Sequence, residues 1–495
     1  MRLIFLAIPI LGLFVLHLVG PASAQTNQDR IQTEHIMADI RELSSLIYGG
    51  RQAGTDGGNQ SAYYVVQRFQ KLGLQPAYPT TSQQSSSTWI QQSPLRAPQI
   101  QPPILITLSP TGTKNKRISF KLEVGKDFLP ILDSPSVNVT APVVFVAYGI
   151  VDPARGVDHY QGVDVHNRIV LFLRGKPPAY SQWVTHEQKA HIAKEKGAAA
   201  YLTVTGQLLN RYQARKGLGQ IPLAIYATSP EDRPIPGAWI SGTDADSLFQ
   251  TLGISLEDLQ QTANHHAGNP SRALPLVAHL RWHSRVTPGR LSNVLGVIPG
   301  SHPIGKKETI VIGAHRDHFG TQAGLQFPGA DDNASGTAIM LEIARLLTSG
   351  SAKPQRTILF ISFDGEERGL LGSKQYVHNP VLPLDKTMAM INLDHVGVGD
   401  GTLTVGVTRL EKSIANHAAK QAGLTEKIKL YGYFPGGDHV PFYEAEVPTI
   451  TIVSAGVHPH FHQPSDTPET INPEILKTAA SFVLSLLDVL ANPND

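Results

Sequence analysis

The 495-residue sequence contains no cysteine. Disulfide bonds, thiolate metal ligands and cysteine nucleophiles are therefore excluded together. Charge of one sign is lacking as well, because 42 Lys and Arg residues stand against 40 Asp and Glu residues. A net charge of +2 does not provide the basic surface that binding along a nucleic acid requires, so we expect no nucleic-acid partner. Catalytic chemistry must come from His, carboxylates, Ser, Thr, Tyr, Lys or a metal without thiolate ligands.

Charged residues are few, at 17%, whereas hydrophobic residues make up 41% of the chain. This balance excludes a disordered, coiled-coil or collagen-like protein. The length exceeds that of one hydrophobic core, so we expect two folded units. A Gly-x-Ser-x-Gly motif is also lacking, which disfavours the serine nucleophile of an α/β-hydrolase.

The N-terminal segment has the pattern of a cleaved signal peptide. Arg2 precedes the nearly continuous apolar run of residues 3–20, and Ala22-Ser23-Ala24 supplies the small-x-small pattern of a cleavage site. We expect residues 1–24 to be removed and the mature protein to be secreted or periplasmic. An uncleaved membrane anchor is the alternative, because the run approaches the length of a transmembrane helix. After cleavage, no later run predicts a stable membrane span.

The hydrophobic pattern divides the rest of the chain into parts. Residues 25–130 begin with helical spacing of apolar residues, and short β-type runs begin near Ala141. We expect a smaller, β-rich domain at residues 131–270, inserted into a larger domain formed by residues 25–130 and 271–495.

The larger domain shows strands and helices in alternation after Ser284. This rhythm predicts an α/β fold with a mostly parallel sheet flanked by helices on both faces. The last helix is predicted to begin at Pro473, with Asn472 as its N-cap. The expected strands lie at residues 309–312, 357–361, 388–391 and 449–453, and expected helices at 337–347 and 412–422.

Histidines and carboxylates follow the predicted strands. The carboxyl ends of parallel strands meet at one edge of a sheet, where ligands bind. Each loop alone has an ordinary explanation as a turn, a helix cap or a hydrogen-bonded histidine, but five at one edge indicate a common purpose. Such a donor set without sulfur suits Zn²⁺ or a similar divalent ion, and two ions sharing a carboxylate would form a dinuclear site. The five loops are residues 313–318, 329–336, 364–369, 392–395 and 458–462.

The motifs in these loops resemble those of the M28 family of zinc-dependent aminopeptidases over about residues 285–492. The helical start with Gly50-Arg51-Gln52-Ala53-Gly54-Thr55 also looks like the opening of that family. The middle unit is similar to the protease-associated (PA) domain often inserted in these enzymes. The resemblance implies a zinc exopeptidase fold with an inserted PA-like domain. The motifs are Gly-Ala-His-x-Asp, Gly-Ala-Asp-Asp-Asn-Ala-Ser-Gly, Glu-Glu-x-Gly-Leu-x-Gly-Ser, Asn-Leu-Asp, Gly-Asp-His-x-Pro-Phe and His-x-Pro-Ser-Asp-Thr.

The resemblance implies two Zn²⁺ ions as cofactors, with the choice of another divalent metal left open. Asp332 is preferred to Asp331 as the bridging ligand because it directly precedes Asn-Ala-Ser-Gly. His462 is favoured by the Pro-Ser-Asp-Thr run at residues 464–467, with His460 or a chelating pair as the alternative. The implied ligands are His315 and Asp394 on one zinc, Glu367 and His462 on the other, and Asp332 between them.

Other roles are implied by the same motifs. Glu366 would be the general base, and Asp317 would orient the ring of His315. One tyrosine, left open among three, would assist at the oxyanion. The sequence departs from the usual pattern at His395, where Met is common, and at Gly437, where Ser is common. The possible substrate pocket consists of His439, Tyr431, Tyr433 and Tyr443.

We therefore predict a metallo-aminopeptidase that hydrolyses N-terminal residues from peptide substrates. A carboxypeptidase or dipeptidase and a glutaminyl cyclase are alternatives on the same scaffold. A non-catalytic binding protein of the peptidase fold is the alternative from another class. The presence of all five implied ligands and of Glu366 argues against it, because a decayed site usually loses one of them. The oligomeric state stays open.

Overall fold

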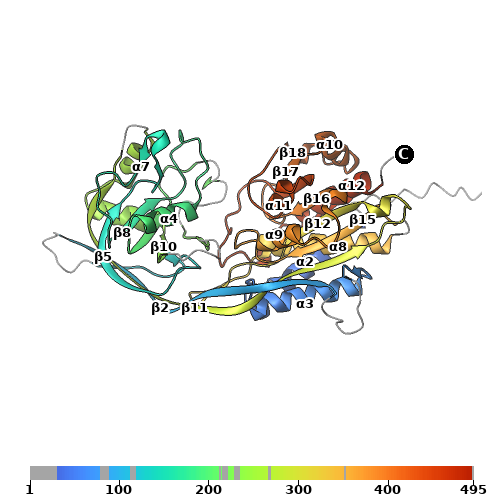
Figure 1. Ribbon diagram of the computed structural model, residues 1–495, viewed down its shortest axis with the longest axis horizontal. Coiled ribbons are helices and arrows are strands. Elements are labelled where there is room, and N and C mark those ends of the chain that lie inside the picture. The colour runs from blue at the N-terminus through green and yellow to red at the C-terminus, as the bar shows by residue number, and fades with distance from the viewer. Residues whose placement is uncertain are drawn as a thin grey trace, which may run out of the picture.

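The computed structural model describes residues 30–78, 88–111, 119–210, 213–214, 221–227, 235–265, 269–350 and 353–492. The chain forms two lobes, which the long strands β2 (Ile90–Pro110) and β11 (Arg272–Ile298) join along one side (Figure 1). The predicted signal peptide at residues 1–24 lies outside the described residues. Among the helices in the described ranges, none has the length and apolar character needed to cross a membrane.

The C-terminal lobe is built on a mostly parallel sheet. Its central strand β12 (Thr309–His315) pairs in parallel with β15 (Thr357–Phe363) and β16 (Thr387–Leu393), and β16 pairs in parallel with β19 (Thr449–Ser454). Every residue of β12 and β15 is buried, as expected for strands covered on both faces. Strands β17 (Leu403–Thr408) and β18 (Ile428–Tyr431) extend the sheet on one side.

Helices cover both faces of this sheet. The alternating side chains of β12 show this directly, because Ile310 and Ile312 pack in one apolar core and Val311 in another. The predicted α/β architecture with helices on both faces is confirmed. The core that contains Ile310 also includes side chains of α2 (Thr33–Leu43), α3 (Asp56–Lys71), α8 (Gly336–Ser349), α10 (Lys412–Gln421) and α12 (Pro473–Ala491), and the core that contains Val311 includes side chains of α9 (Leu371–His378) and α11 (His439–Glu444).

Strand β11 belongs to both lobes. Its last residues, Val294–Ile298, pair antiparallel with β15, whereas its first part pairs with β5 (Val137–Phe145). Strand β2 pairs with β11 over almost its whole length. The Gln-rich and Pro-rich sequence of β2 has no clear alternation, so pairing with a distant strand, not local pattern, accounts for its extended form.

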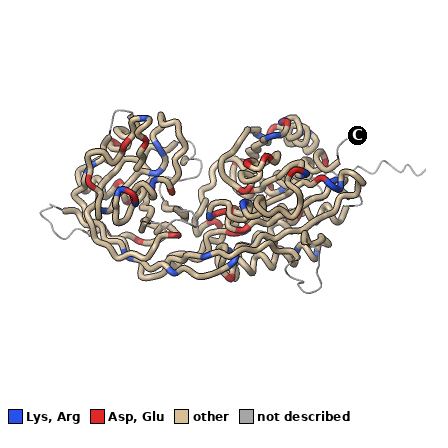
Figure 2. The backbone as a smooth tube through the Cα atoms, in the orientation of Figure 1, with Lys and Arg blue, Asp and Glu red and all other residues tan. Residues whose placement is uncertain are grey.

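The strands of the inserted lobe continue the same sheet beyond β11. Strands β5, β8 (Ile169–Leu173), β9 (Ala200–Val204) and β10 (Gly237–Ile240) pair in parallel, and β4 (Phe128–Pro130) pairs antiparallel with β10. The predicted boundaries of 131–270 stay a prediction, and β4 lies just before them. Both signs of charge are spread over the two lobes without a single large block (Figure 2). In the described parts of this lobe the α-helices are α4 (His186–Glu195), α6 (Gly242–Thr251) and α7 (Leu256–Asn264).

Candidate metal centre

The candidate site lies where strands of the C-terminal lobe end. His315 is the last residue of β12, and Asp394 directly follows β16. Glu367 lies in the turn after β15, Asp332 lies just before α8, and His462 lies in the loop after β19. Because parallel strands present their carboxyl ends at one edge of the sheet, these five residues are brought together from distant parts of the chain.

Asp332 lies at the centre of this cluster. Its Oδ1 lies 3.3 Å from Nε2 of His315, and its Oδ2 lies 3.1 Å from Nε2 of His462. On the first side, His315 Nε2 also lies 3.3 Å from Asp394 Oδ1. On the second side, His462 Nε2 lies 3.6 Å from Glu367 Oε2. The five residues thus form two adjacent groups that share one carboxylate.

The geometry of Asp332 fits a pair of cations. Two ligand atoms about 2.0–2.1 Å from a tetrahedral zinc ion lie roughly 3.3 Å apart, which is close to the separations in both groups. Both carboxylate oxygens of Asp332 are buried, and within the described part of the chain neither accepts a hydrogen bond of ordinary geometry. A buried carboxylate without donors is costly unless a cation lies against it. Two histidines and three carboxylates form a donor set that suits Zn²⁺.

Burial and like charge raise the pKa values of the two adjacent glutamates. Burial, together with the carboxylates of Asp332 and Glu366, raises the pKa of Glu367 well above its usual range. Burial also raises the pKa of Glu366, with Asp394 as the leading negative neighbour. For Asp332 burial acts in the same direction, but the facing imidazoles outweigh it and hold its pKa well below the usual range. Divalent cations would relieve the repulsion among these carboxylates.

His318 lies beside the cluster, although sequence reasoning did not select it. Its Nδ1 donates a hydrogen bond to Glu367 Oε1 over 2.7 Å. This bond holds one oxygen of Glu367 and leaves Oε2 facing His462. His318 therefore orients a proposed ligand, in the manner of outer-shell partners of metal sites. Its position three residues after His315 in the same loop was the signal available in the sequence.

Asp466 is a second residue that sequence reasoning did not select. Its carboxylate accepts the backbone N–H groups of Asp331 over 2.9 Å and of Asp332 over 3.0 Å. These bonds hold the backbone from which the Asp332 side chain points to the cluster. Asp466 belongs to the Pro-Ser-Asp-Thr run that favoured His462, so this run also fixes the loop of the shared carboxylate.

Asp331 is turned away from the cluster. Its Oδ2 lies 2.8 Å from Nδ1 of His458, and its Oδ1 accepts the backbone N–H of Gly397. Nε2 of His458 in turn faces the carbonyl oxygen of Ser454 at 3.1 Å. The separation of 2.8 Å between Asp331 and His458 is that of a direct hydrogen bond and is shorter than the roughly 3.3 Å between two ligand atoms on one zinc ion. Asp331, His395 and His458 lie close enough together to hold a cation, but hydrogen bonds already pair Asp331 with His458 and with Gly397.

His460 and His395 differ in how they lie relative to the cluster. His460 Nδ1 lies 2.9 Å from Ser465 Oγ, so His462 is the member of the alternating run that faces Asp332. His395, which stands where Met is common, points its Nε2 toward the cluster. This nitrogen lies 3.4 Å from Asp394 Oδ1 and 3.7 Å from Asp332 Oδ2.

Asp317 contacts both the predicted base and a predicted ligand. Its Oδ1 accepts the backbone N–H of Glu366 over 3.1 Å. Nδ1 of His315 lies 3.2 Å from the backbone oxygen of Asp317 and 3.7 Å from its Oδ1. The carbonyl oxygen is therefore the nearer partner of the ring, and it leaves Nε2 of His315 directed at Asp332 and Asp394.

The predicted substrate-pocket residues all lie between Tyr431 at the end of β18 and Tyr443 in α11. His439 is buried, with Nε2 2.9 Å from the carbonyl oxygen of Phe434. Tyr431 and Tyr433 are about half exposed, at 52% and 48%, and the rings of Tyr433 and Tyr443 lie 4.8 Å apart. In the described parts of the chain, no hydrogen bond or ion pair joins these four residues to the cluster. Their contact with substrate stays a prediction.

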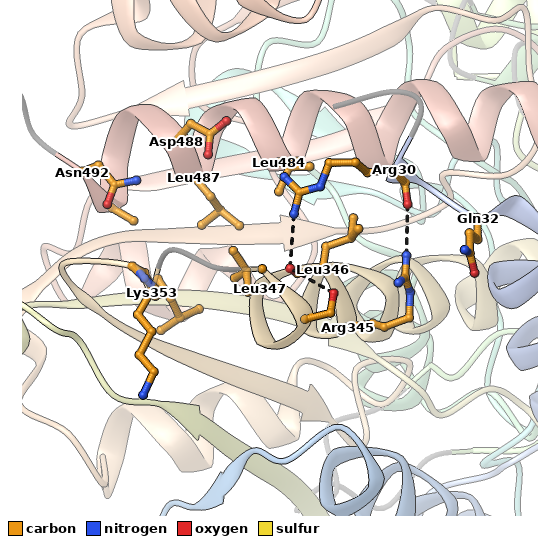
Figure 3. Close-up of a pocket in the computed structure, with 15 residues that line it drawn as sticks. Arg30, Gln32, Arg345, Leu346, Leu347, Lys353, Leu484, Leu487, Asp488 and Asn492 are labelled. Atoms are coloured by element: carbon orange, nitrogen blue, oxygen red, sulfur yellow. Dashed lines mark hydrogen bonds between the residues drawn. The ribbon is translucent and has the colours of Figure 1, made fainter. Parts of the chain in front are cut away.

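A cavity of about 500 Å³ lies at the opposite edge of the sheet (Figure 3). It is lined by the C-terminal turns of α8 and α12 and by Ile358, the second residue of β15. Arg30 and Arg345 at its rim point to carbonyl oxygens of neighbouring chain segments, namely Leu346 and Arg30. These arginines tie the N-terminal segment to α8, so we assign the cavity no catalytic role.

The sheet order, the helices on both faces and the buried cluster of histidines and carboxylates define an α/β lobe with a candidate metal centre. Residues 293–487 match the model described as Peptidase family M28, so this part of the chain is similar to that family.

Named relatives show the same likeness. Aminopeptidase YwaD of Bacillus subtilis is 35% identical over 32% of this chain, and Aminopeptidase NAALADL1 of Mus musculus is 28% identical over 52% of it. These alignments span only 36% and 41% of the two relatives' lengths. The solved aminopeptidase from Aneurinibacillus sp. strain AM-1 shares the fold over 95% of this chain and 97% of its own, with a TM-score of 0.66 and 23% identity.

Proposed function

We propose that the protein is a metallo-aminopeptidase that binds two Zn²⁺ ions and removes N-terminal residues from peptides. The observation that carries this proposal is the shared carboxylate of Asp332, whose two oxygens face His315 and His462 at 3.3 Å and 3.1 Å. The M28 match supports the reaction class, and the aminopeptidase names of the relatives support the choice of the N-terminal bond.

The proposed ligands divide between the two sides of Asp332. His315 and Asp394 would hold one cation, and His462 and Glu367 would hold the other. Zinc ions bound there would supply a polarised water molecule and a Lewis acid for the carbonyl oxygen of the substrate. His318 and Asp317 hold Glu367 and His315 in the orientation that this binding needs.

Glu366 is the proposed general base. Its carboxylate lies close enough to His315 and Asp394 to interact with both, and it is not one of the five proposed cation ligands. In this role it accepts the proton of the attacking water and returns it to the leaving amine. Burial raises its pKa, and cationic charge beside it would lower the pKa toward a range in which both transfers are possible.

The free α-amine of the substrate is proposed to determine that cleavage occurs at the N-terminal end of the peptide. Carboxylates outnumber cationic side chains in the cluster, and they favour a peptide that brings a free α-ammonium group. A peptide whose amine is acetylated loses this charge while keeping the same scissile bond.

Three matched peptides test the proposal: one with both ends free, one N-acetylated and one with a C-terminal amide. We expect release of the N-terminal residue from the first and third, resistance of the second, and loss of turnover after chelation with recovery on adding Zn²⁺. Cleavage from the carboxyl end would indicate a carboxypeptidase, and cyclisation of an N-terminal glutamine would indicate a glutaminyl cyclase. Binding without turnover would indicate a receptor.

Export through the predicted signal peptide is part of the proposal. N-terminal sequencing of the mature protein from the periplasm or the medium should begin at Gln25, and a chain that retains residues 1–24 in the membrane would contradict cleavage.

A further inference from the structure

The inserted lobe contacts the cluster through residues 221–227, called here the docking segment. The backbone N–H of Ala224 donates to the carbonyl oxygen of His462 over 3.1 Å. In return, Nδ1 of His462 donates to the carbonyl oxygen of Ala224 over 3.0 Å. The two residues are 238 positions apart in the chain, and Ala224 is completely buried.

The bond from Nδ1 to Ala224 decides which nitrogen of His462 carries hydrogen. A carbonyl oxygen only accepts, so the hydrogen must be on Nδ1. The other nitrogen, Nε2, then carries the lone pair that a cation needs, and it faces Asp332 Oδ2 at 3.1 Å and Glu367 Oε2 at 3.6 Å. Ligating histidines generally need such a partner to fix the tautomer and ring orientation.

The other proposed histidine ligand does not depend on the inserted lobe in this way. Nδ1 of His315 faces the carbonyl oxygen of Asp317, two residues along the same loop, at 3.2 Å. One side of the cluster is therefore oriented within the C-terminal lobe, whereas the His462 side is oriented by a segment of the inserted lobe.

The docking segment is held firmly in the inserted lobe. The backbone N–H of Leu132 donates to the carbonyl oxygen of Ile225 over 3.0 Å, and the N–H of Ala227 donates to Asp133 Oδ1 over 3.0 Å. Leu223 and Ala227 are buried in an apolar core of that lobe. A movement of the inserted lobe would therefore carry Ala224 with it.

Side chains of the C-terminal lobe contact the docking segment. Gln52 Nε2 donates to the hydroxyl of Tyr226 over 3.1 Å, and the guanidinium of Arg368 lies 5.5 Å from the centre of the Tyr226 ring. Phe319 contacts both partners, since its ring centre lies 5.8 Å from that of Tyr226 and 4.6 Å from that of His462. Tyr226 and Ala224 thus dock beside the cluster as one unit.

We infer that the docking segment is a positioning element of the metal centre, so that docking of the inserted lobe and cation binding on the His462 side stabilise each other. The inference rests on the proposed metal centre and gives the inserted lobe a role in it. Coupling of this kind is reciprocal: the factor by which docking tightens cation binding is also the factor by which the cation tightens docking.

Variants that loosen the docking segment, away from the ligands, test this coupling. Tyr226→Phe removes the bond from Gln52, and Asp133→Ala removes the acceptor for Ala227 N–H. The matched controls in the same lobe are Tyr180→Phe, which loses a hydroxyl bond to Asp152, and Asp164→Ala, which loses a backbone N–H bond from His166. Each protein is titrated with Co²⁺ against a competing chelator, and its absorption spectrum is recorded at each step.

In the combined Tyr226→Phe and Asp133→Ala protein, we expect one of two cations to bind about 10-fold or more weakly, on the scale of outer-shell substitutions. The absorption band of this Co²⁺ ion should change. The affinity for the other Co²⁺ ion should stay the same, and both control proteins should bind two ions as the unsubstituted protein does. Unchanged affinity for both cations would overturn the inference and leave the metal centre standing. Binding of no cation by the unsubstituted protein would overturn the metal centre and the inference with it.

Hydrogen exchange on the unsubstituted protein tests the coupling between docking and cation binding without relying on the folding of any variant. The amides of residues 221–227 should exchange several-fold more slowly with Zn²⁺ present than after chelation, and amides of β8 should exchange equally in both. Equal exchange of the docking segment in the two conditions would contradict the reciprocal stabilisation.

Discussion

The guanidinium of Arg51 donates from Nε to the carbonyl oxygen of Arg316 over 2.6 Å, although the two residues lie 265 positions apart. Arg316 follows the proposed ligand His315. Arg51 is completely buried, and burial lowers its pKa to about 10. One side chain of the N-terminal segment therefore ties together the two loops that carry His315 and Asp332. The same guanidinium also donates to the carbonyl oxygens of Leu43, Pro328 and Gly329.

Arg51→Met should destabilise the C-terminal lobe strongly. Methionine fills much of the same space but removes a donor from four carbonyl oxygens, of which Gly329 O still accepts the backbone N–H of Ala334. Because each carbonyl oxygen left without a donor costs about 1–3 kcal/mol, we expect the free energy of unfolding in urea to fall by at least about 3 kcal/mol. The exposed Arg281→Met is the control and should change it by less than about 0.5 kcal/mol. A similar small change for Arg51→Met would contradict this role.

Glu366→Gln should separate catalysis from metal binding. The amide keeps the size of the side chain but cannot accept the proton of water, so kcat should fall at least about 10²-fold. Metal content by elemental analysis should stay at that of the unsubstituted protein, because Glu366 is not a proposed ligand. The exposed Glu444→Gln serves as the control. Near-normal kcat would remove Glu366 from the role of base.

Asp332→Asn and Asp331→Asn should differ, although the residues are adjacent. Asp332 faces both proposed histidine ligands, so the protein with asparagine at this position should lose both cations. Asp331 instead bonds to His458, so its amide should retain both cations while the thermal stability falls. Elemental analysis of the two dialysed proteins is the measurement. Two equivalents in Asp332→Asn would refute the shared carboxylate.

Acid should destabilise the inserted lobe through His159. Burial lowers the pKa of His159 from 6.5 to about 4, with Lys189 acting in the same direction and Asp158 opposing. Below pH 6.5 His159 is therefore protonated in the unfolded chain but stays neutral in the folded chain. The free energy of unfolding consequently falls as the pH is lowered from 6.5 toward 4. The full effect is about 3 kcal/mol, at 1.36 kcal/mol per pKa unit.

His159→Gln tests this pH dependence. Glutamine can accept the backbone N–H of Ile150, as Nδ1 of His159 does, but does not titrate. Urea unfolding, followed by tryptophan fluorescence between about pH 7 and pH 4.5, should show a smaller loss of stability in the variant. The buried His186, whose pKa is also lowered, is present in both proteins and cancels in the comparison. Equal losses of stability in the two proteins would show that His159 does not contribute to the pH dependence of the free energy of unfolding.

Local pattern predicted the elements that lie entirely within one lobe. The apolar runs at residues 309–312 and 357–361 became β12 and β15, and Asn472 caps α12 through its side chain as expected. Strand β11 escaped prediction over most of its 27 residues because its pairing with β2, β5 and β15 comes from distant parts of the chain. The same reason hid the docking segment, whose short run of small and apolar residues has no motif.

The sequence by itself determined the absence of thiol chemistry, the buried parallel strands and the order of histidine and carboxylate loops along the chain, because composition and periodicity are local properties. Only the tertiary structure decided that Asp332 faces two histidines while Asp331 turns to His458, and that Ala224 reaches His462 from the other lobe. The direction of a side chain depends on what packs against it, and here those neighbours lie up to hundreds of residues away.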